Sequence, residues 1–178
     1  MTYFAEGLAT KGFRVVRFEF SYMALRRRDG RKRPPDRQPV LLDCWRTVID
    51  ALSDRPLVIG GKSMGGRMAS LIAAEPLPDH VRGLVCLGYP FYGAGRKDKP
   101  RVAHLAALAA PTLVCQGTRD AMGDRAAVQA LSLSPKIALH WAEDGDHDLK
   151  PRKASGRNVD QNHSEALDAL VQFLARLA

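Results

Sequence analysis

Short apolar runs alternate along the chain with longer segments in which apolar residues recur at helical spacing. The runs predict β-strands at residues 13–20, 57–60, 83–88, 111–116 and 136–141, and the longer segments predict helices at residues 2–10, 40–52, 64–74, 121–132 and 161–177. Strands that alternate with helices in this way predict an α/β fold, with a mostly parallel sheet covered by helices on both faces.

The length of the chain suits one hydrophobic core better than two, so residues 1–178 are interpreted as a single domain. No apolar run reaches the length that a bilayer-spanning helix needs, and no membrane association is expected. Cys44, Cys86 and Cys115 have no paired spacing, and two of them lie in predicted buried strands. They indicate reduced core thiols and a cytoplasmic protein. No oligomeric state is predicted.

Much of the net charge of +8 sits in residues 26–37. This stretch lacks apolar periodicity and is expected to be a solvated, partly mobile loop, since charge runs are usually exposed. A patch that binds nucleic acid is a disfavoured alternative. A third interpretation is that the loop, which follows the end of the strand predicted at 13–20, draws anionic substrates to a site at that edge. The basic stretch at residues 150–153 supports this third interpretation.

Residues 61–65 form a G-x-S-x-G motif between an apolar run and a predicted helix, which is the setting of a nucleophile elbow. The sharp turn lifts the hydroxyl of Ser63 out of the sheet, and Gly61 and Gly65 are expected where side chains would come too close. The backbone N–H of Met64 is expected to supply one oxyanion-hole donor. A phosphate-binding loop would need a glycine where Pro56 stands, so that alternative is disfavoured.

Two later strands end in residues that suit a catalytic acid and base. Asp120 follows the run at 111–116 and His147 follows the run at 136–141, in the chain order serine, acid, histidine. The prediction is that His147 takes the proton of Ser63 and that Asp120 orients the imidazole. Asp124 is a second candidate for the acid, and Asp120 as a helix cap is the alternative. The other histidines compete poorly with His147; they are His80, His104, His140 and His163.

The acidic residues around His147 are the one candidate for a metal site. Asp144, Asp146 and Asp148 have the spacing that begins a calcium loop. That loop requires glycine at its sixth position and glutamate at its twelfth, where this chain has Leu149 and Ser155. No metal and no cofactor is therefore expected.

Three segments, residues 58–69, 87–91 and 143–149, resemble the α/β-hydrolase superfamily. More narrowly, they and residues 150–156 are similar to small bacterial hydrolases related to dienelactone hydrolase. These are grouped with the hydrolase-like domain of a chromatin-complex (NSL) subunit and of testis-expressed proteins. The resemblance implies the α/β-hydrolase fold and the same three residues, Ser63, Asp120 and His147. It is consistent with cleavage of an ester or thioester of a small acid, a small-molecule acyl substrate.

The chain departs from the family at its beginning. In the family, a strand precedes the helix expected here at 2–10 and ends in a His-Gly-rich loop that supplies the second oxyanion donor; no H-G-x-G occurs here. We therefore expect a natural start further upstream, a sheet without its N-terminal strands, and weak or no activity for this length of chain. The alternative function is a non-catalytic, hydrolase-like module that binds protein partners.

Overall fold

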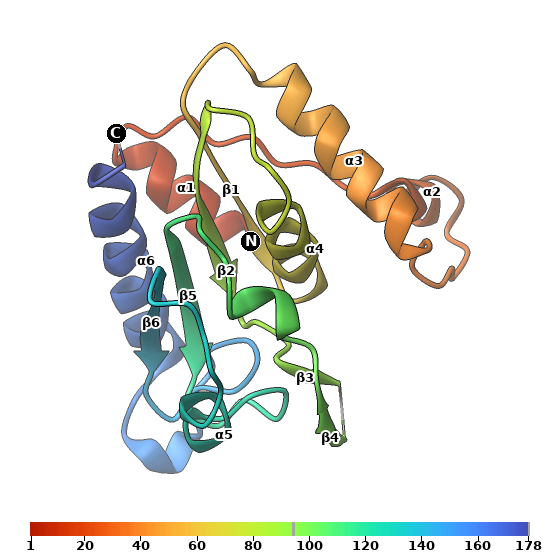
Figure 1. Cartoon of the computed structure of the whole chain (residues 1–178). Helices are drawn as coiled ribbons and strands as arrows, with labels where there is room; N and C mark the ends of the chain where they lie inside the picture. Colours follow the sequence, from red (N-terminus) through yellow and green to blue (C-terminus); the bar gives the residue numbers. More distant parts are fainter. Residues whose placement is uncertain (94, 178) are drawn as a thin grey trace.

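The computed structural model describes residues 1–93 and 95–177, and a parallel sheet lies at its centre. Its strands are β1 (Leu57–Lys62), β2 (Val81–Leu87), β5 (Thr112–Gly117) and β6 (Ile137–Ala142), hydrogen-bonded in the order β1-β2-β5-β6 (Figure 1). All neighbours pair in parallel register. The strands predicted at 57–60, 83–88, 111–116 and 136–141 are thereby confirmed, and their carboxyl ends meet at one edge.

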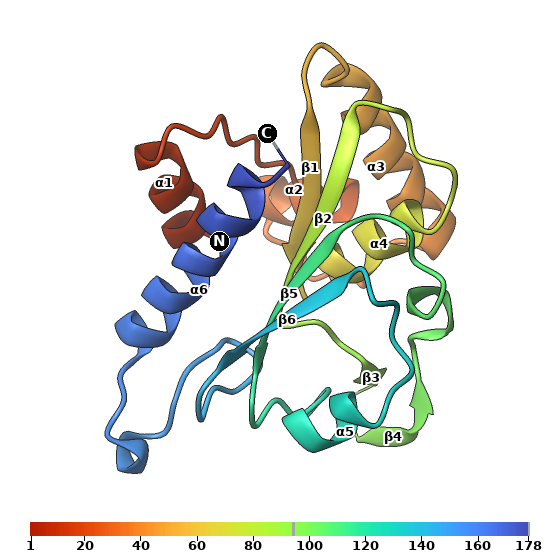
Figure 2. The same cartoon turned by 60° about the vertical axis from the view of Figure 1, so that its left-hand side comes forward.

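Helices cover both faces of the sheet, as the alternating pattern predicts (Figure 2). α3 (Gln38–Ala51) and α4 (Met64–Ala73) lie on one face. On the other face, α6 (Val159–Ala175) packs on β5 and β6, and α1 (Thr2–Thr10) packs on α6. No described helix is long and apolar enough to cross a membrane.

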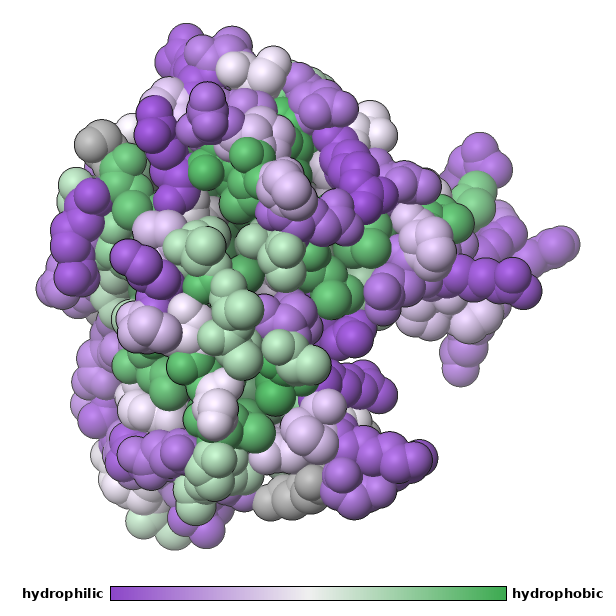
Figure 3. Space-filling view, in the orientation of Figure 1, coloured by the Kyte–Doolittle hydropathy of each residue, from purple (hydrophilic) through white to green (hydrophobic). Residues whose placement is uncertain are grey.

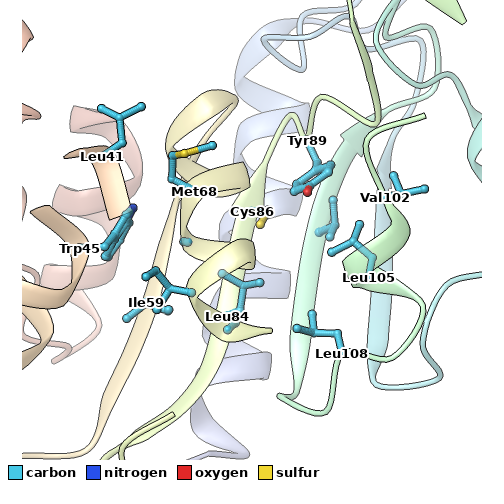
Figure 4. Close-up of a cluster of buried hydrophobic side chains, with 14 of the residues drawn as sticks. Leu41, Trp45, Ile59, Met68, Leu84, Cys86, Tyr89, Val102, Leu105 and Leu108 are labelled. Carbon is cyan, nitrogen blue, oxygen red and sulfur yellow. The ribbon is translucent and has the colours of Figure 1, made fainter. Parts of the chain in front are cut away.

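Each face of the sheet has its own hydrophobic core. The larger core joins α3, α4 and the 3-10 helix η1 (Ala103–Leu105) to the sheet, and ten of its side chains are labelled in Figure 4. The smaller core joins α1 and α6 to the opposite face, around Leu113, Cys115 and Leu170. Burial on both faces explains why β5, in which every residue is buried, reads as a continuous apolar run.

The prediction of a strand at residues 13–20 is wrong. These residues form no strand, and most of them are exposed. A strand needs a neighbour for its N–H and C=O groups, and among the described residues β1 pairs with β2 alone. Phe20 is buried and Phe18 is half-buried in another way: the ring of Phe18 lies 4.7 Å from that of Trp45 and 5.6 Å from that of Phe20.

The prediction of a loop over residues 26–37 is partly wrong, because α2 (Ser21–Asp29) includes its first four residues. Arg26, Arg27 and Arg28 occupy the last turn, where cations interact favourably with the helix dipole, and Gly30 ends the helix with a φ of 69°. The three arginines are exposed. Figure 3 shows mainly hydrophilic side chains where the molecule projects beside α2.

Several further elements differ from the prediction or were missed. The helix expected at 121–132 is limited to α5 (Arg125–Gln129). A short antiparallel hairpin of β3 (Tyr92–Gly93) and β4 (Arg96–Pro100) follows β2, and the 3-10 helix η2 (Lys153–Ser155) precedes α6. α6 itself begins with a capping box of Asn158 and Gln161, which fixes its start two residues before the predicted one.

Candidate active site

Ser63 stands in a strained turn between β1 and α4, with φ 52° and ψ −120°. Gly61 and Gly66 make the turn possible: a Cβ on Gly61 would lie 2.7 Å from the carbonyl carbon of Gly65, and one on Gly66 would lie 2.6 Å from the Gly61 oxygen. The expectation for Gly65 is wrong, because a Cβ there would meet nothing within 4 Å. The close approach between strand and helix therefore requires that Gly61 and Gly66 carry no side chain, whereas Gly65 contributes its backbone alone.

The structure brings Ser63, Asp120 and His147 together at the carboxyl ends of β1, β5 and β6. The Nε2 atom of His147 lies 2.8 Å from Oγ of Ser63, and its Nδ1 atom lies 2.7 Å from Oδ2 of Asp120. The Asp120 side chain is fully buried, and its Oδ1 atom accepts a hydrogen bond of 2.8 Å from the backbone N–H of Met122. A hydroxyl, an imidazole and a buried carboxylate in this sequence of contacts can activate the serine oxygen as a nucleophile.

A match to a known protein family shows to which family this chain belongs. The family model of the alpha/beta hydrolase domain matches residues 1–175. The chain belongs to the α/β-hydrolase superfamily.

Solved structures support this fold for the hydrolase chain. It is similar to an alpha-beta serine hydrolase homologue from Coxiella burnetii, at 19% identity, a TM-score of 0.66, and coverage of 96% of this chain and 74% of that one. The esterase domain of a Rhodothermus marinus protein matches at 17% identity and a TM-score of 0.65, covering 98% and 78%. A predicted CIB-like hydrolase from Thermoplasma acidophilum matches at 20% identity and a TM-score of 0.57. The match covers 79% of this chain and 61% of that protein.

Glycines at two other strand ends let the loop that carries His147 lie against the hydrolase sheet. A Cβ on Gly117, at the end of β5, would lie 2.2 Å from the backbone oxygen of Asp146. A Cβ on Gly88, which has a φ of 58°, would lie 2.4 Å from the backbone oxygen of His147. The imidazole therefore reaches Ser63 because two backbones can approach without side chains between them.

Gln116 supports the carboxylate of Asp120, a role that was not predicted from the sequence. Its fully buried side chain donates from Nε2 to Oδ2 of Asp120 at 2.8 Å, and also to the backbone oxygens of Tyr89 and Gly123. Its Oε1 atom accepts from the backbone N–H of Tyr89 at 2.7 Å. The available signal was an amide side chain inside an otherwise apolar strand, four residues before the predicted acid.

The alternatives to Asp120 and His147 lie in other environments. Asp124 is the N-cap of α5 and accepts from the backbone N–H of Ala127 at 2.9 Å. His80 and His163 lie beside backbone oxygens, of Ile49 and Asp148 respectively, and His104 contacts Ser70.

Of the three aspartates around His147, Asp144 and Asp146 stabilise the loop, and Asp148 forms an ion pair with Lys62 of β1. Asp144 binds Arg119 and Arg152, and the hydrogen bonds from Arg152 lower its pKa to about 2. Asp146 accepts from the backbone N–H groups of Asp148 and of residue 150. Within the described part of the chain, no three His, Cys, Asp or Glu side chains are arranged to hold a metal ion.

Two hollows border the site. One, of about 760 Å³, lies beside Asp120 and is lined by Gly95, Thr118, Arg119, Asp120, Ala121 and Asp124. The other, of about 230 Å³, lies beside His147 and is lined by Met1, Phe4, Lys62, Leu87, His147, Asp148, Leu149, Lys150 and His163. Met64 follows Ser63 and is the first residue of α4. Its backbone N–H has no acceptor within the helix, because the first N–H groups of a helix have no intrahelical partner.

Proposed function

We propose that this chain is a serine hydrolase that cleaves an ester or thioester of a small acid. The observation that supports the proposal is the continuous series of hydrogen bonds from Ser63 through His147 to Asp120. The resemblance of residues 58–69, 87–91 and 143–149 supports the further proposal that it belongs to the dienelactone-hydrolase-like branch, beside the NSL-complex and testis-expressed hydrolase-like domains.

The reaction proceeds in two steps at Ser63. In the first, Oγ attacks the substrate carbonyl while Nε2 of His147 takes its proton, and the backbone N–H of Met64 donates to the oxyanion that forms. Collapse of this intermediate expels the alcohol or thiol, which receives the proton from His147, and leaves an acyl group on Ser63. In the second step, His147 takes a proton from a water molecule that attacks the acyl carbonyl, and the bond between the acyl group and Oγ breaks as His147 returns the proton to Oγ and the acid leaves. Asp120 stabilises the imidazolium in both steps.

We further propose that the acyl substrate carries a negative charge and that the protein is cytoplasmic. Lys62 and Asp148 line the hollow beside His147 as an ion pair, and the ammonium group of Lys150 in the same hollow favours a negatively charged substrate. Cys44, Cys86 and Cys115 are free thiols, and burial raises the pKa of Cys115 to about 12, which keeps it protonated and unreactive. Free thiols in the core are typical of a reducing compartment.

The test is labelling with a fluorophosphonate probe, which reacts with activated serines. The wild-type chain should be labelled, and Ser63→Ala should abolish the label, because it removes the attacking oxygen. Ser53→Ala is the matched control, since Ser53 is exposed and lies outside the motif. Equal labelling of wild type and Ser63→Ala would contradict the proposal. A folded wild-type chain without label would support the non-catalytic, partner-binding module instead.

A further inference from the structure

Lys62 and Asp148 form an ion pair between the residue that precedes Ser63 and the residue that follows His147. The side chains are 36% and 50% exposed. Among the described residues, two side-chain contacts of hydrogen-bond or ion-pair type join residues 57–66 to residues 143–158: this ion pair and the contact of Ser63 with His147. The ion pair therefore connects the segments that carry the proposed nucleophile and base, immediately beside the reacting atoms.

Apart from the packing of the His147 backbone against Gly88 at the end of β2, the two segments are bonded to different strands of the sheet. β1 is an edge strand that pairs with β2, and the backbone N–H of Ser63 donates to the Leu87 oxygen at 3.0 Å. The loop that carries His147 is tied to the β5 side, where Asp144 binds Arg119 and the backbone N–H of Arg119 donates to the Gly145 oxygen at 2.9 Å. A small shift between the two sides would change the separation of Ser63 and His147 directly.

We propose that Lys62 and Asp148 are positioning residues, whose ion pair holds the base at hydrogen-bond distance from the nucleophile. This inference rests on the proposed hydrolase function. A partly exposed ion pair contributes little to stability. A misplacement of about 1 Å at a reacting centre, in contrast, can lower the rate about a hundredfold. Loss of the pair therefore lowers turnover and leaves the fold intact.

The pair also balances charge around the imidazole of His147. The hydrogen bond from Lys62 lowers the pKa of Asp148, so that carboxylate is ionised beside the imidazole. The other ionisable groups close to His147 are Asp120 from the end of β5, His163 from α6, and Lys150 across the same hollow. Lys62→Met leaves the Asp148 charge unbalanced beside the imidazole, and Asp148→Asn leaves the Lys62 charge unbalanced there. The two substitutions therefore disturb the site with opposite signs of charge.

The experiment measures kcat and KM for an activated ester, across pH, in Lys62→Met, Asp148→Asn, the double variant and Lys62→Arg. We expect each single removal to lower kcat about tenfold with little change in KM, because the pair holds reacting groups and not substrate. The double variant should lose no more than the worse single variant. Lys62→Arg should stay within about threefold of wild type, since it keeps the charge.

Glu143→Gln is the matched control, because Glu143 forms a similarly exposed ion pair with Arg125 at the start of the same loop. It should keep wild-type kcat, and the melting temperatures of all variants should be close. Single variants within twofold of wild type, or losses that multiply in the double variant, would overturn the positioning role while the hydrolase proposal stands. A folded wild-type chain that neither turns over esters nor reacts with the probe would overturn both.

Discussion

Acidification should destabilise the chain through His104, which lies in a polar cluster inside the larger core. Its Nε2 atom lies 2.8 Å from Oγ of Ser70 and 3.3 Å from the hydroxyl of Tyr89. Oγ of Ser70 donates its one hydrogen to the Arg67 carbonyl at 2.8 Å, so Nε2 of His104 is the donor to Ser70. The acid-sensitive atom is then Nδ1. Burial, and secondarily the charge of Arg67, lowers the pKa of His104 to about 4.

The size of the effect follows from this lowered pKa. An unfolded chain binds the proton below pH 6.5, whereas the folded chain binds it only near pH 4. Between these values the unfolded state carries more protons, so the free energy of unfolding falls as the pH falls. Each pKa unit corresponds to about 1.4 kcal/mol, which gives an upper bound of about 3 kcal/mol for the loss. A protein with about 5–15 kcal/mol of total stability should show this clearly.

Urea unfolding between about pH 7.5 and pH 4 measures the effect, with His104→Gln as the comparison. Glutamine can donate a hydrogen bond to Ser70 and does not titrate, so its variant should lose up to about 3 kcal/mol less than wild type over this range. Burial also lowers the pKa of His140, but that contribution is common to both chains and cancels in the difference. Parallel stability curves for wild type and His104→Gln would refute the reasoning.

Two other substitutions test how the candidate site is supported. Gly117→Ala should lower the free energy of unfolding by about 1–3 kcal/mol and slow ester turnover, because its Cβ would meet the backbone oxygens of Asp146 and Gly145 at 2.2 and 2.4 Å. Urea unfolding measures the loss. The control is Gly65→Ala, which adds its Cβ in open space and should change the free energy of unfolding by about 1 kcal/mol or less. Equal losses at both positions would contradict this account. Gln116→Met should cost on the order of 3 kcal/mol and lower kcat, because it leaves the buried backbone N–H of Tyr89 without its acceptor and Oδ2 of Asp120 with His147 as its remaining side-chain partner. Thermal melts and ester kinetics check it, and a variant with wild-type kcat would show that Asp120 needs no support from residue 116.

The positions of the site residues were predictable because they depend on local rules. Ser63 follows from a five-residue motif between a strand and a helix, and Asp120 and His147 follow from chain order and strand ends. Gln116 depends on contacts with the backbone of Tyr89 and Gly123, which no local pattern contains. The same holds for the Lys62–Asp148 ion pair, whose partners are 86 residues apart.

The strand predicted at residues 13–20 shows the same limit for the fold. Alternating side chains give a segment the capacity to pair, but a strand exists only where a neighbour supplies the complementary N–H and C=O groups. β5, with a neighbour on each side, is wholly buried, whereas β1 pairs on one side and has a single buried residue, Ile59. Ser63 thus stands at the end of the less enclosed strand. The alignment of Ser63 with His147 must therefore depend on α4, on the hydrogen bonds between β1 and β2, and on side-chain contacts such as the Lys62–Asp148 ion pair.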